Sequence, residues 1–472
     1  MTGLGLDLGS RWAKLATASA AVEPAGRAEP LALTRVDGRP FAGKAAYSTL
    51  PTPGARLVER FTAALAGSDA EAAQATDDVR DFLAALYGAT LPPDVAAVVP
   101  EHWLRRPAST TGPGDRLLAT LRNLGVARPR LVSHPRAVLA YLMGGAGQFA
   151  DGDRVLLVDV GASSVAVTLG AVRDGRPSIL DATWSGFPDV DQLIADAVLG
   201  PDPSRPRAIV GLRRAIAAQR QEQAGLVDML LTEFARGAPA AVAFEVAGHS
   251  VTSTAIHEAL APVRQSVEAT VVRLRAAHAA DLEPGRRWRL VLTGGTALTT
   301  QVAMVVHRAV GNDLDATWNH LVPLDPSQTL HAAAFGAALV AAGAIEPGDR
   351  FPSAVTLRAH RVAGGRLTAA DLHLCAADEL AAGQPEPTYA AAGGTPVSVD
   401  VSEGAATSFE LLIDGQAVLV GDQAPSPGTY HIGLQLDPAG RLDLICREIG
   451  SGRQWRRRVP VPPVNSGRGD TR

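Results

Sequence analysis

Lysine and cysteine are scarce in this chain of 472 residues. Only Lys14 and Lys44 are lysines among 44 basic residues, so chemistry that requires a lysine amine has two candidates. The two cysteines, Cys375 and Cys446, are too few for a disulfide framework, which favours a reducing compartment.

The chain also lacks a strong charge of either sign and a long hydrophobic run. Its 44 basic and 48 acidic residues give a formal net charge of −4, so neither a nucleic acid nor an anionic membrane is expected as a partner. The longest apolar stretches, such as 331–344, are too short to span a membrane. The N-terminus does not resemble a signal peptide. We therefore expect a soluble, cytoplasmic protein.

One short pattern occurs twice. Residues 6–10 read Leu-Asp-Leu-Gly-Ser, and residues 158–162 read Val-Asp-Val-Gly-Ala. Each follows a short apolar run and precedes a second β-like run, which predicts a strand, a turn and a strand. Two such hairpins far apart in the chain predict a duplicated α/β architecture with one hairpin in each of two lobes.

The segments around the hairpins alternate between strand-like and helix-like patterns. Strands are predicted at 95–99 and at 289–293, where the second runs into Gly294-Gly295-Thr296. The segments with a helical pattern are 116–124, 137–143, 190–198, 208–236, 254–279 and 331–344. This alternation predicts an α/β domain over residues 1–345.

The pattern changes at residues 346–351, which read as a linker. Beyond them, short alternating runs predict an all-β domain over 352–460, with one strand at 409–413 and a hairpin formed by 430–436 and 442–446. Residues 461–472 are rich in Pro and Gly and are expected to be disordered.

The two Asp-x-Gly turns suit a polyphosphate. Glycine lets backbone amides approach phosphate oxygens, and a carboxylate at a strand end can hold a hydrated Mg²⁺. Asp7 and Asp159 would bracket the metal through water and orient the attacking water in hydrolysis. One Asp-x-Gly alone is more often an ordinary turn, but two copies followed by Gly-Gly-Thr favour a nucleotide site. The predicted binding residues are Gly9, Ser10, Arg11, Gly161, Ala162, Ser163 and Ser164 for the phosphates, and Gly294, Gly295 and Thr296 for the adenosine.

These motifs resemble the 70-kDa heat-shock chaperone (DnaK-type) family within the actin and sugar-kinase superfamily. The similar segments are 4–10, 98–100, 133–141, 158–164, 290–296, 334–338 and 427–447. The resemblance implies a two-lobed, actin-like (ribonuclease H-like) ATPase domain followed by a β-sandwich. It implies ATP or ADP and Mg²⁺ as cofactors, with slow ATP hydrolysis coupled to a client protein or peptide held by the sandwich. Actins and sugar kinases lack that sandwich, so a filament protein or a small-molecule kinase is a weaker match.

Several positions depart from the family pattern. His134 stands where the family has a catalytic Glu, and a histidine cannot replace a carboxylate on Mg²⁺. The family's catalytic lysine should fall within 56–61, which holds Arg56 and Arg60, and no lysine lies within 213–225, where the family has an adenosine clamp. The linker carries charges, and no helical lid follows the sandwich. The alternative is therefore a pseudo-ATPase scaffold that binds nucleotide without hydrolysing it and serves a dedicated protein partner.

Overall fold

The chain was analysed as a computed structural model with mixed α/β architecture. The residues that the structure describes are 2–19, 22–88, 91–104, 112–146, 149, 152–173, 176–199, 206–279, 282, 287–311, 320–345, 351, 353–363, 366–376, 379–381, 386–392, 395–402, 408–421, 425–437 and 441–460. The predicted tail at 461–472 and residues 346–350 of the predicted linker lie outside these ranges.

The first hairpin belongs to a five-stranded N-terminal sheet with the order β3-β2-β1-β7-β8. The first three strands are antiparallel neighbours, and β7 and β8 run parallel to β1. The strands are β1 (Thr2–Leu8), β2 (Trp12–Ser19), β3 (Val22–Pro30), β7 (Asp94–Val99) and β8 (Arg128–Ser133). Leu4 and Leu6 of β1 are buried in one core with α3 (Asp69–Tyr87) and α5 (Pro113–Asn123).

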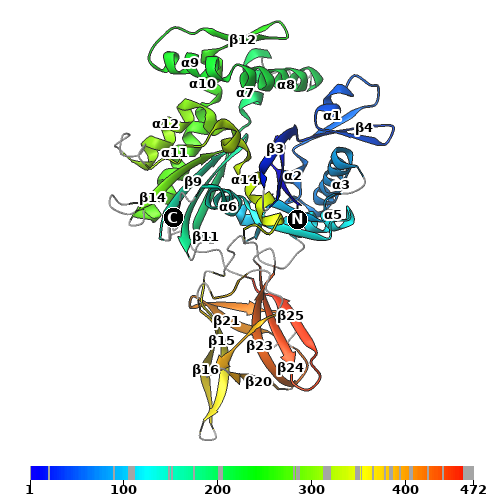
Figure 1. The fold of residues 1–472 in the computed structure, drawn as a ribbon, viewed down its shortest axis with the longest axis vertical. Helices are drawn as coiled ribbons and strands as arrows, with labels where there is room; N and C mark the ends of the chain where they lie inside the picture. Colours follow the sequence, from blue (N-terminus) through cyan, green and yellow to red (C-terminus); the bar gives the residue numbers. More distant parts are fainter. Residues whose placement is uncertain are drawn as a thin grey trace.

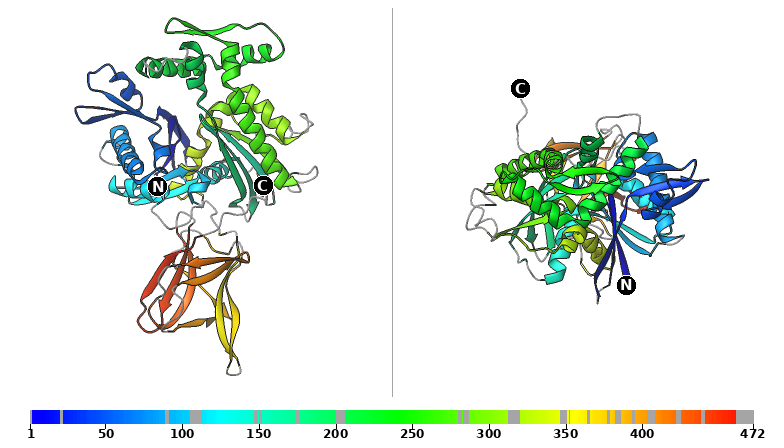
Figure 2. Two further views of the ribbon diagram at one scale, coloured as in Figure 1. Left: turned by 180° about the vertical axis from the view of Figure 1, so that it is seen from behind. Right: turned by 90° about the horizontal axis from the view of Figure 1, so that it is seen from above.

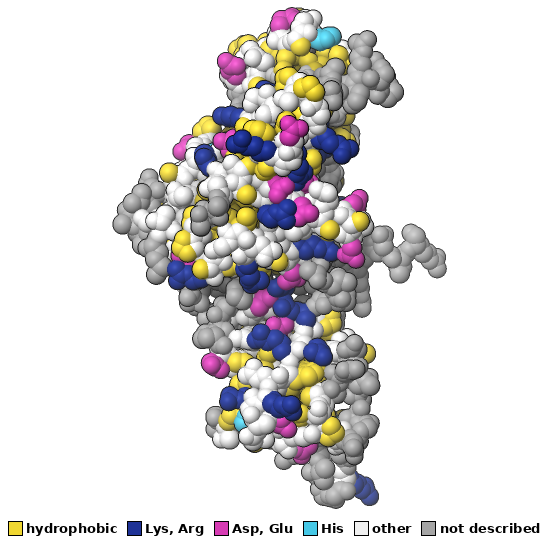
Figure 3. Space-filling view, turned by 90° about the vertical axis from the view of Figure 1, so that its right-hand side faces the viewer, with side chains coloured by type: hydrophobic (Ala, Val, Ile, Leu, Met, Phe, Trp, Pro, Cys, Tyr) yellow, Lys and Arg dark blue, Asp and Glu magenta, His cyan; other side chains and the backbone are white. Residues whose placement is uncertain are grey.

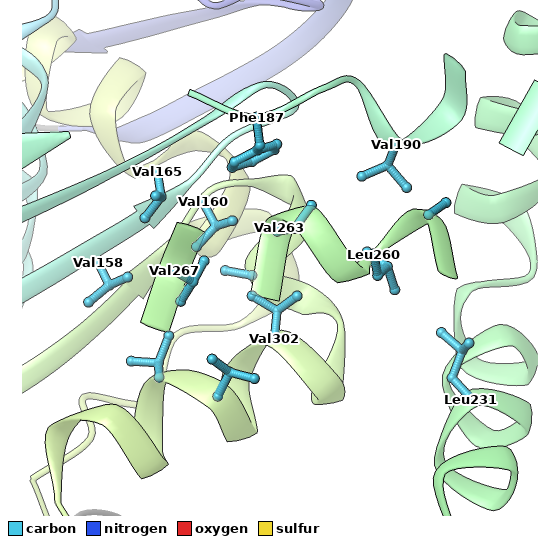
Figure 4. Packing of buried hydrophobic residues seen from close by; sticks show 14 of the residues in the cluster. Val158, Val160, Val165, Phe187, Val190, Leu231, Leu260, Val263, Val267 and Val302 are labelled. Atoms are coloured by element: carbon cyan, nitrogen blue, oxygen red, sulfur yellow. The ribbon is translucent and has the colours of Figure 1, made fainter. Parts of the chain in front are cut away.

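The second hairpin belongs to a central sheet with the order β11-β10-β9-β14. Its strands are β9 (Arg154–Val160), β10 (Ser164–Arg173), β11 (Arg176–Gly186) and β14 (Trp288–Thr293). Val158 and Val160 pack against α11 (Ala261–Ala277) and α12 (Thr300–Val310) on one face, through residues such as Val263, Val267 and Val302 (Figure 4). The order of strands, with two antiparallel neighbours and then a parallel one, repeats that of the N-terminal sheet. Both predicted hairpins are therefore present, each in its own sheet.

The remaining elements complete two units. The N-terminal unit combines the N-terminal sheet, α3 and α5 with β4 (Ala32–Val36), β5 (Arg39–Ala42), β6 (Arg56–Glu59), α1 (Lys44–Ser48), α2 (Phe61–Ala64) and α4 (Glu101–Leu104). The central unit combines the central sheet, α11 and α12 with α7 (Val190–Leu199), α8 (Pro206–Glu222), α9 (Ala224–Ala235), α10 (Ser253–Ala259), β12 (Val242–Val246), β13 (His249–Thr252) and the short 3₁₀ helix η2 (Gly295–Leu298).

Two of the segments predicted as single helices each form two helices in the structure. The segment 208–236 is two helices, α8 and α9, with Gln223 between them. The segment 254–279 is also two helices, α10 and α11. Proline lacks a backbone N–H and is favoured in the first turn of a helix, so Pro262 starts a new helix at this point rather than extending the old one.

Two helices lie between the sheets. They are α6 (His134–Ala146) and α14 (Pro326–Ala341), which lie between the two sheets in Figure 1 and in the left view of Figure 2. The contact is close because it involves glycines. A Cβ on Gly336 would stand 1.7 Å from the carbonyl oxygen of Ala137 in α6, and a Cβ on Gly5 would stand 2.1 Å from the carbonyl oxygen of Ala334. Backbone therefore packs directly against backbone at this junction.

The strands from 355 to 458 form a separate sandwich with its own core, below the α/β part in Figure 1. One sheet has the order β16-β15-β21-β22; the other has β17-β23-β24-β25, with β20 also paired to β23. The predicted strand at 409–413 and the predicted hairpin are both present. The bounds are β15 (Val355–Ala363), β16 (Arg366–Cys375), β17 (Thr388–Tyr389), β18 (Ala391–Ala392), β19 (Thr395–Pro396), β20 (Ser398–Val401), β21 (Phe409–Ile413), β22 (Gln416–Val420), β23 (Gly428–Leu436), β24 (Leu442–Glu448) and β25 (Gln454–Arg458).

The edges of the sandwich differ from the prediction in one respect. Phe351, which was assigned to the linker, is buried in the sandwich core, and its N–H donates to the carbonyl of Leu380 at 2.9 Å. An ion pair between Arg441 and Asp115 joins the sandwich to α5 of the N-terminal unit. The two parts therefore touch through at least one charged contact.

Two surface properties are plain. None of the described helices is both long and apolar enough to cross a bilayer. On the face shown in Figure 3, basic and acidic side chains are interspersed over both parts, and the described residues of this face form no large patch of one sign.

Gly336→Ala is expected to destabilise the α/β part by about 3 kcal/mol or more, because the new methyl group overlaps the backbone of α6. The matched control is Gly211→Ala in α8, where a Cβ meets nothing within 4 Å. That change should stabilise by about 0.5–1 kcal/mol, because Ala loses less conformational entropy than Gly in a helix. Urea unfolding followed by circular dichroism measures both. Equal midpoints for Gly336→Ala and the wild type would contradict the packing.

Candidate functional site

The two Asp-x-Gly turns have the same hydrogen bonds. The N–H of Gly9 donates to the carbonyl of Trp12 at 3.0 Å, and the N–H of Gly161 donates to the carbonyl of Ser164 at 2.9 Å. Each turn also accepts a hydrogen bond from the end of the third strand of its sheet. The N–H of Leu31 donates to the carbonyl of Arg11 at 2.7 Å, and the N–H of Phe187 donates to the carbonyl of Ser163 at 2.9 Å. The turns are thus equivalent in geometry as well as in sequence. Their glycine amides are used inside the turns, so phosphate donors would have to come from other groups.

Both turns open into one cavity of about 650 Å³. This volume lies in the usual range for small-molecule sites. All but one of the predicted site residues line it: Asp7, Gly9, Ser10, Arg11, Asp159, Gly161, Ala162, Ser163, Ser164, Gly295 and Thr296. Residues separated by about a third of the chain therefore meet around a single space.

Gly294 is the exception, because it does not line the cavity. Its φ is +89°, and a Cβ there would stand 2.3 Å from the carbonyl oxygen of Val160. The glycine therefore lets the end of β14 press against the end of β9. Thr296 then reaches the neighbouring turn, where its Oγ1 donates to the carbonyl of Gly161 at 2.7 Å. Gly294 positions the wall of the site and does not form it.

Lys14 is the main site residue that sequence reasoning missed. It lies opposite Asp7 in the β1–β2 register, and its Nζ is 2.9 Å from Asp7 Oδ2. Both side chains are largely buried, with 14% and 8% of their surface exposed, and both residues line the cavity. The resemblance implied a lysine within 56–61, where the chain has Arg56 and Arg60 instead, whereas Lys14 lies on the strand that follows the first turn. The signal that could have found it is the short turn, which places Asp7 and Lys14 at matching positions on its two sides.

Asp7 and Lys14 each stabilise the charged form of the other. Burial alone would raise the pKa of Asp7, but the ammonium of Lys14 lowers it below the ordinary value for an aspartate. Burial alone would lower the pKa of Lys14, but the carboxylates of Asp7 and then Asp159 raise it. Lys14 is therefore a cation held by both predicted metal-site aspartates.

Asp159 has further neighbours of its own. Thr293 Oγ1 donates to Asp159 Oδ1 at 3.2 Å, and Nε2 of His134, the first residue of α6, lies 3.7 Å from Asp159 Oδ2. Among the described residues, no group of three or more His, Cys, Asp and Glu side chains is arranged to hold a metal ion. The ammonium beside Asp7 and the hydroxyl donor on Asp159 occupy part of the carboxylate surface that a hydrated Mg²⁺ would use.

Arg11 belongs to an ion-pair network that joins the two units. Its Nε and Nη2 each lie 2.6 Å from the carboxylate of Asp189, and its Nη1 lies 2.9 Å from Asp191. Asp189 also binds Arg60 at 2.5 Å, and Asp191 binds Arg220 at 2.9 Å. The three nitrogens of the Arg11 guanidinium are thus engaged with aspartates of the central unit. The predicted phosphate ligand Arg11 lines the cavity but acts here as a bridge.

Arginines in the two segments where the resemblance implies a lysine belong to the same network of ion pairs. Arg60 lies within 56–61, while Arg213 and Arg220 lie within 213–225. Arg213 pairs with Glu59 of β6, which adds a second link between the units. Burial would raise the pKa of Asp189, but Arg11 and Arg60 lower it below the ordinary value.

The rest of the cavity wall is more apolar. Val227 and Leu231 of α9 and Ile256 of α10 line it from the central unit. On a further part of the wall, His102 of α4 and Trp184 of β11 stack with their ring centroids 5.1 Å apart. The cavity thus combines polar turns with apolar surface, which suits a ligand that has a charged end and a flat, apolar end.

No protein-family model and no curated protein matches this sequence.

Asp189→Asn is expected to destabilise the protein by about 3 kcal/mol, because it leaves Arg11 and Arg60 with a neutral partner at a site where the aspartate side chain is 2% exposed. The matched control is Asp77→Asn, which removes one member of an exposed pair with Arg80 and should cost about 0.5 kcal/mol or less. Urea unfolding at neutral pH compares the two variants.

The stability difference between the wild type and Asp189→Asn should change with pH in one direction. Because the pKa of Asp189 is lowered in the folded state, its charge contributes stability above the unfolded pKa of about 3.9 and loses it as the pH falls further. The gap between wild type and Asp189→Asn should therefore narrow below about pH 4. A gap that widens on acidification would show that Asp189 is not held as a carboxylate by the arginines.

Proposed function

We propose that this chain binds an adenine nucleotide in the cavity between its N-terminal and central units. The observation that carries the proposal is the meeting of two geometrically equivalent Asp-x-Gly turns around one space, next to a Gly-Gly-Thr segment. The repeated strand order further supports two actin-like lobes of the kind that the 70-kDa heat-shock resemblance implies. The fold alone does not define an activity, so the proposal rests on the site.

The residues divide between the two ends of a nucleotide. The hydroxyls of Ser10, Ser163 and Ser164 lie on the turns and can donate to phosphate oxygens. The ammonium of Lys14 adds a positive charge beside them. The apolar wall of α9 and α10 offers a surface for the base and ribose, near Gly295 and Thr296.

Binding without efficient hydrolysis is the form of the activity that this site favours. His134 stands beside Asp159 where the resembling family has a glutamate, and Lys14 occupies one side of Asp7. An aspartate paired with an ammonium is a weaker base for activating water, because its pKa is lowered. Slow, Mg²⁺-assisted ATP hydrolysis through Asp7 and Asp159 is the second candidate, and the two retained aspartates favour it.

The sandwich is the proposed partner-binding part. Strand β22 ends the described sheet β16-β15-β21-β22, and its Leu419 is 65% exposed. An extended client segment can add to such an edge through backbone hydrogen bonds. The edge strand β25 is less suited, because it carries Arg456, Arg457 and Arg458 in succession. The competing arrangement is a sandwich that serves one dedicated partner or stays docked on the N-terminal unit, and the Arg441–Asp115 pair favours that docking.

We place this activity in the cytoplasm. The two cysteines, Cys375 and Cys446, are buried free thiols, as expected in a reducing compartment.

The nucleotide proposal predicts that ATP and ADP bind to the full-length chain, as measured by titration calorimetry. The double variant Ser10→Ala/Ser163→Ala should bind about tenfold or more weakly, because a hydrogen bond to a charged group contributes about 1.5–3 kcal/mol. Ser48→Ala is the matched control, since Ser48 is exposed in α1 and does not line the cavity.

A phosphate-release assay on the full-length protein distinguishes nucleotide binding alone from ATP hydrolysis. Phosphate release from ATP should be very slow in the wild type and faster in His134→Glu, which restores a carboxylate beside Asp159. Rapid turnover by the wild type would favour the ATPase, and the absence of binding by either nucleotide would exclude the nucleotide site altogether.

The sandwich proposal predicts weak, fast-exchanging binding of extended peptides to the full-length chain, as measured by fluorescence anisotropy with a peptide library. Leu419→Lys should weaken the best peptide by about tenfold, because it places a charge on the pairing edge. Val272→Lys is the control, since Val272 is a similarly exposed apolar residue on α11. A library without any binder would indicate a dedicated partner instead.

A further inference from the structure

The space beside the two aspartates already contains a positive charge that belongs to the chain. Lys14 Nζ lies 2.9 Å from Asp7 Oδ2. Lys14 lines the cavity together with both aspartates. A buried ammonium beside a buried carboxylate is a stable arrangement only while the two charges remain paired.

The second hairpin has an alanine at the position that Lys14 occupies in the first hairpin. Asp7 faces Lys14 across the first turn, whereas Asp159 faces Ala166 across the second. Ala166 also lines the cavity, so the small side chain leaves room on the side of Asp159. The cavity therefore has one lysine ammonium beside its two turns, on the side of Asp7.

Part of the Asp159 carboxylate is already engaged by neighbouring side chains. Asp159 Oδ1 accepts from Thr293, and Oδ2 faces His134 at 3.7 Å. A divalent cation beside Asp7 would also be repelled by the ammonium at close range. An ammonium has three N–H donors, and Lys14 can give one to Asp7 while another reaches a phosphate oxygen.

We propose that Lys14 takes the place of the divalent cation, so that the cavity binds the phosphates of a nucleotide without Mg²⁺. This inference rests on the proposed nucleotide site and names its mode of phosphate recognition. The ammonium of Lys14 stays beside Asp7 when the ligand binds and supplies the positive charge that Mg²⁺ would otherwise bring.

The test is calorimetry of the full-length chain with ADP, once in excess EDTA and once in excess Mg²⁺. Wild-type affinity should be the same in both, within about twofold. Lys14→Met should lose about tenfold or more in EDTA, because it removes a charged donor to phosphate and keeps the length of the side chain. Lys44→Met is the matched control and should bind like the wild type, since Lys44 is the only other lysine, is exposed and does not line the cavity.

The outcomes are distinct. Wild-type binding that requires Mg²⁺, or full affinity of Lys14→Met in EDTA, would overturn the role of Lys14 while leaving the nucleotide site intact. Absence of ADP binding under both conditions would remove the nucleotide site itself and this inference with it.

A second measurement does not depend on the folding of Lys14→Met. Wild-type protein labelled with ¹³C at the lysine Cε gives two signals, because the chain has two lysines, and the Lys44→Met spectrum assigns them. ADP in EDTA should shift the Lys14 signal and leave the Lys44 signal in place. If saturating ADP shifts neither signal, Lys14 does not contact the phosphates and the proposal is wrong.

Discussion

The arrangement of the whole α/β part depends on the backbone contact between α6 and α14. At Gly336 the two helices approach so closely that any side chain would overlap Ala137, and at Gly5 strand β1 lies equally close to α14. The same pair of helices covers the inner face of both sheets. Because β1 and β9 are fixed against this shared layer, their C-terminal turns face one cavity. Larger residues at these positions would separate the sheets and, with them, Asp7 from Asp159.

Charge balance is the second constraint on the site. The cavity contains several basic side chains, but the structure pairs Lys14 with Asp7, Arg11 with Asp189 and Asp191, and Arg220 with Asp191. Arginine suits such bridges, because its planar guanidinium binds a carboxylate through two nitrogens at once, whereas lysine offers a compact charge. Arg11 therefore joins the two units, Arg220 holds Asp191 within the central unit, and Lys14 is the lysine cation beside the turns.

The sequence predicted the local features of the site better than the contacts between distant segments. The two hairpins, their Asp and Gly residues and the alternating strands at 430–446 follow from short-range periodicity, which depends on neighbouring residues alone. The contact of Arg11 with Asp189 joins positions 178 residues apart, and no local pattern marks such a partner. Lys14 was missed for a different reason: its role follows from the register of one hairpin, whereas the family resemblance implies a lysine within 56–61. Gly294 was assigned to the ligand because its close approach to another backbone looks the same in sequence as an approach to adenosine.

The first Asp-x-Gly turn and the ion pairs of Arg11 that join the two units are neighbours in the chain. Ser10 lines the cavity, and Arg11, the next residue, holds Asp189 and Asp191 of the central unit. If the proposed anion binds at Ser10, it would compete with the two aspartates for the guanidinium of Arg11. Conversely, a firm Arg11–Asp189 contact fixes the turn on which Ser10 lies, and linkage requires that each effect equals the other in free energy. Under the proposed function, Arg11 is therefore the side chain through which ligand binding at this turn would be linked to the contact between the two units.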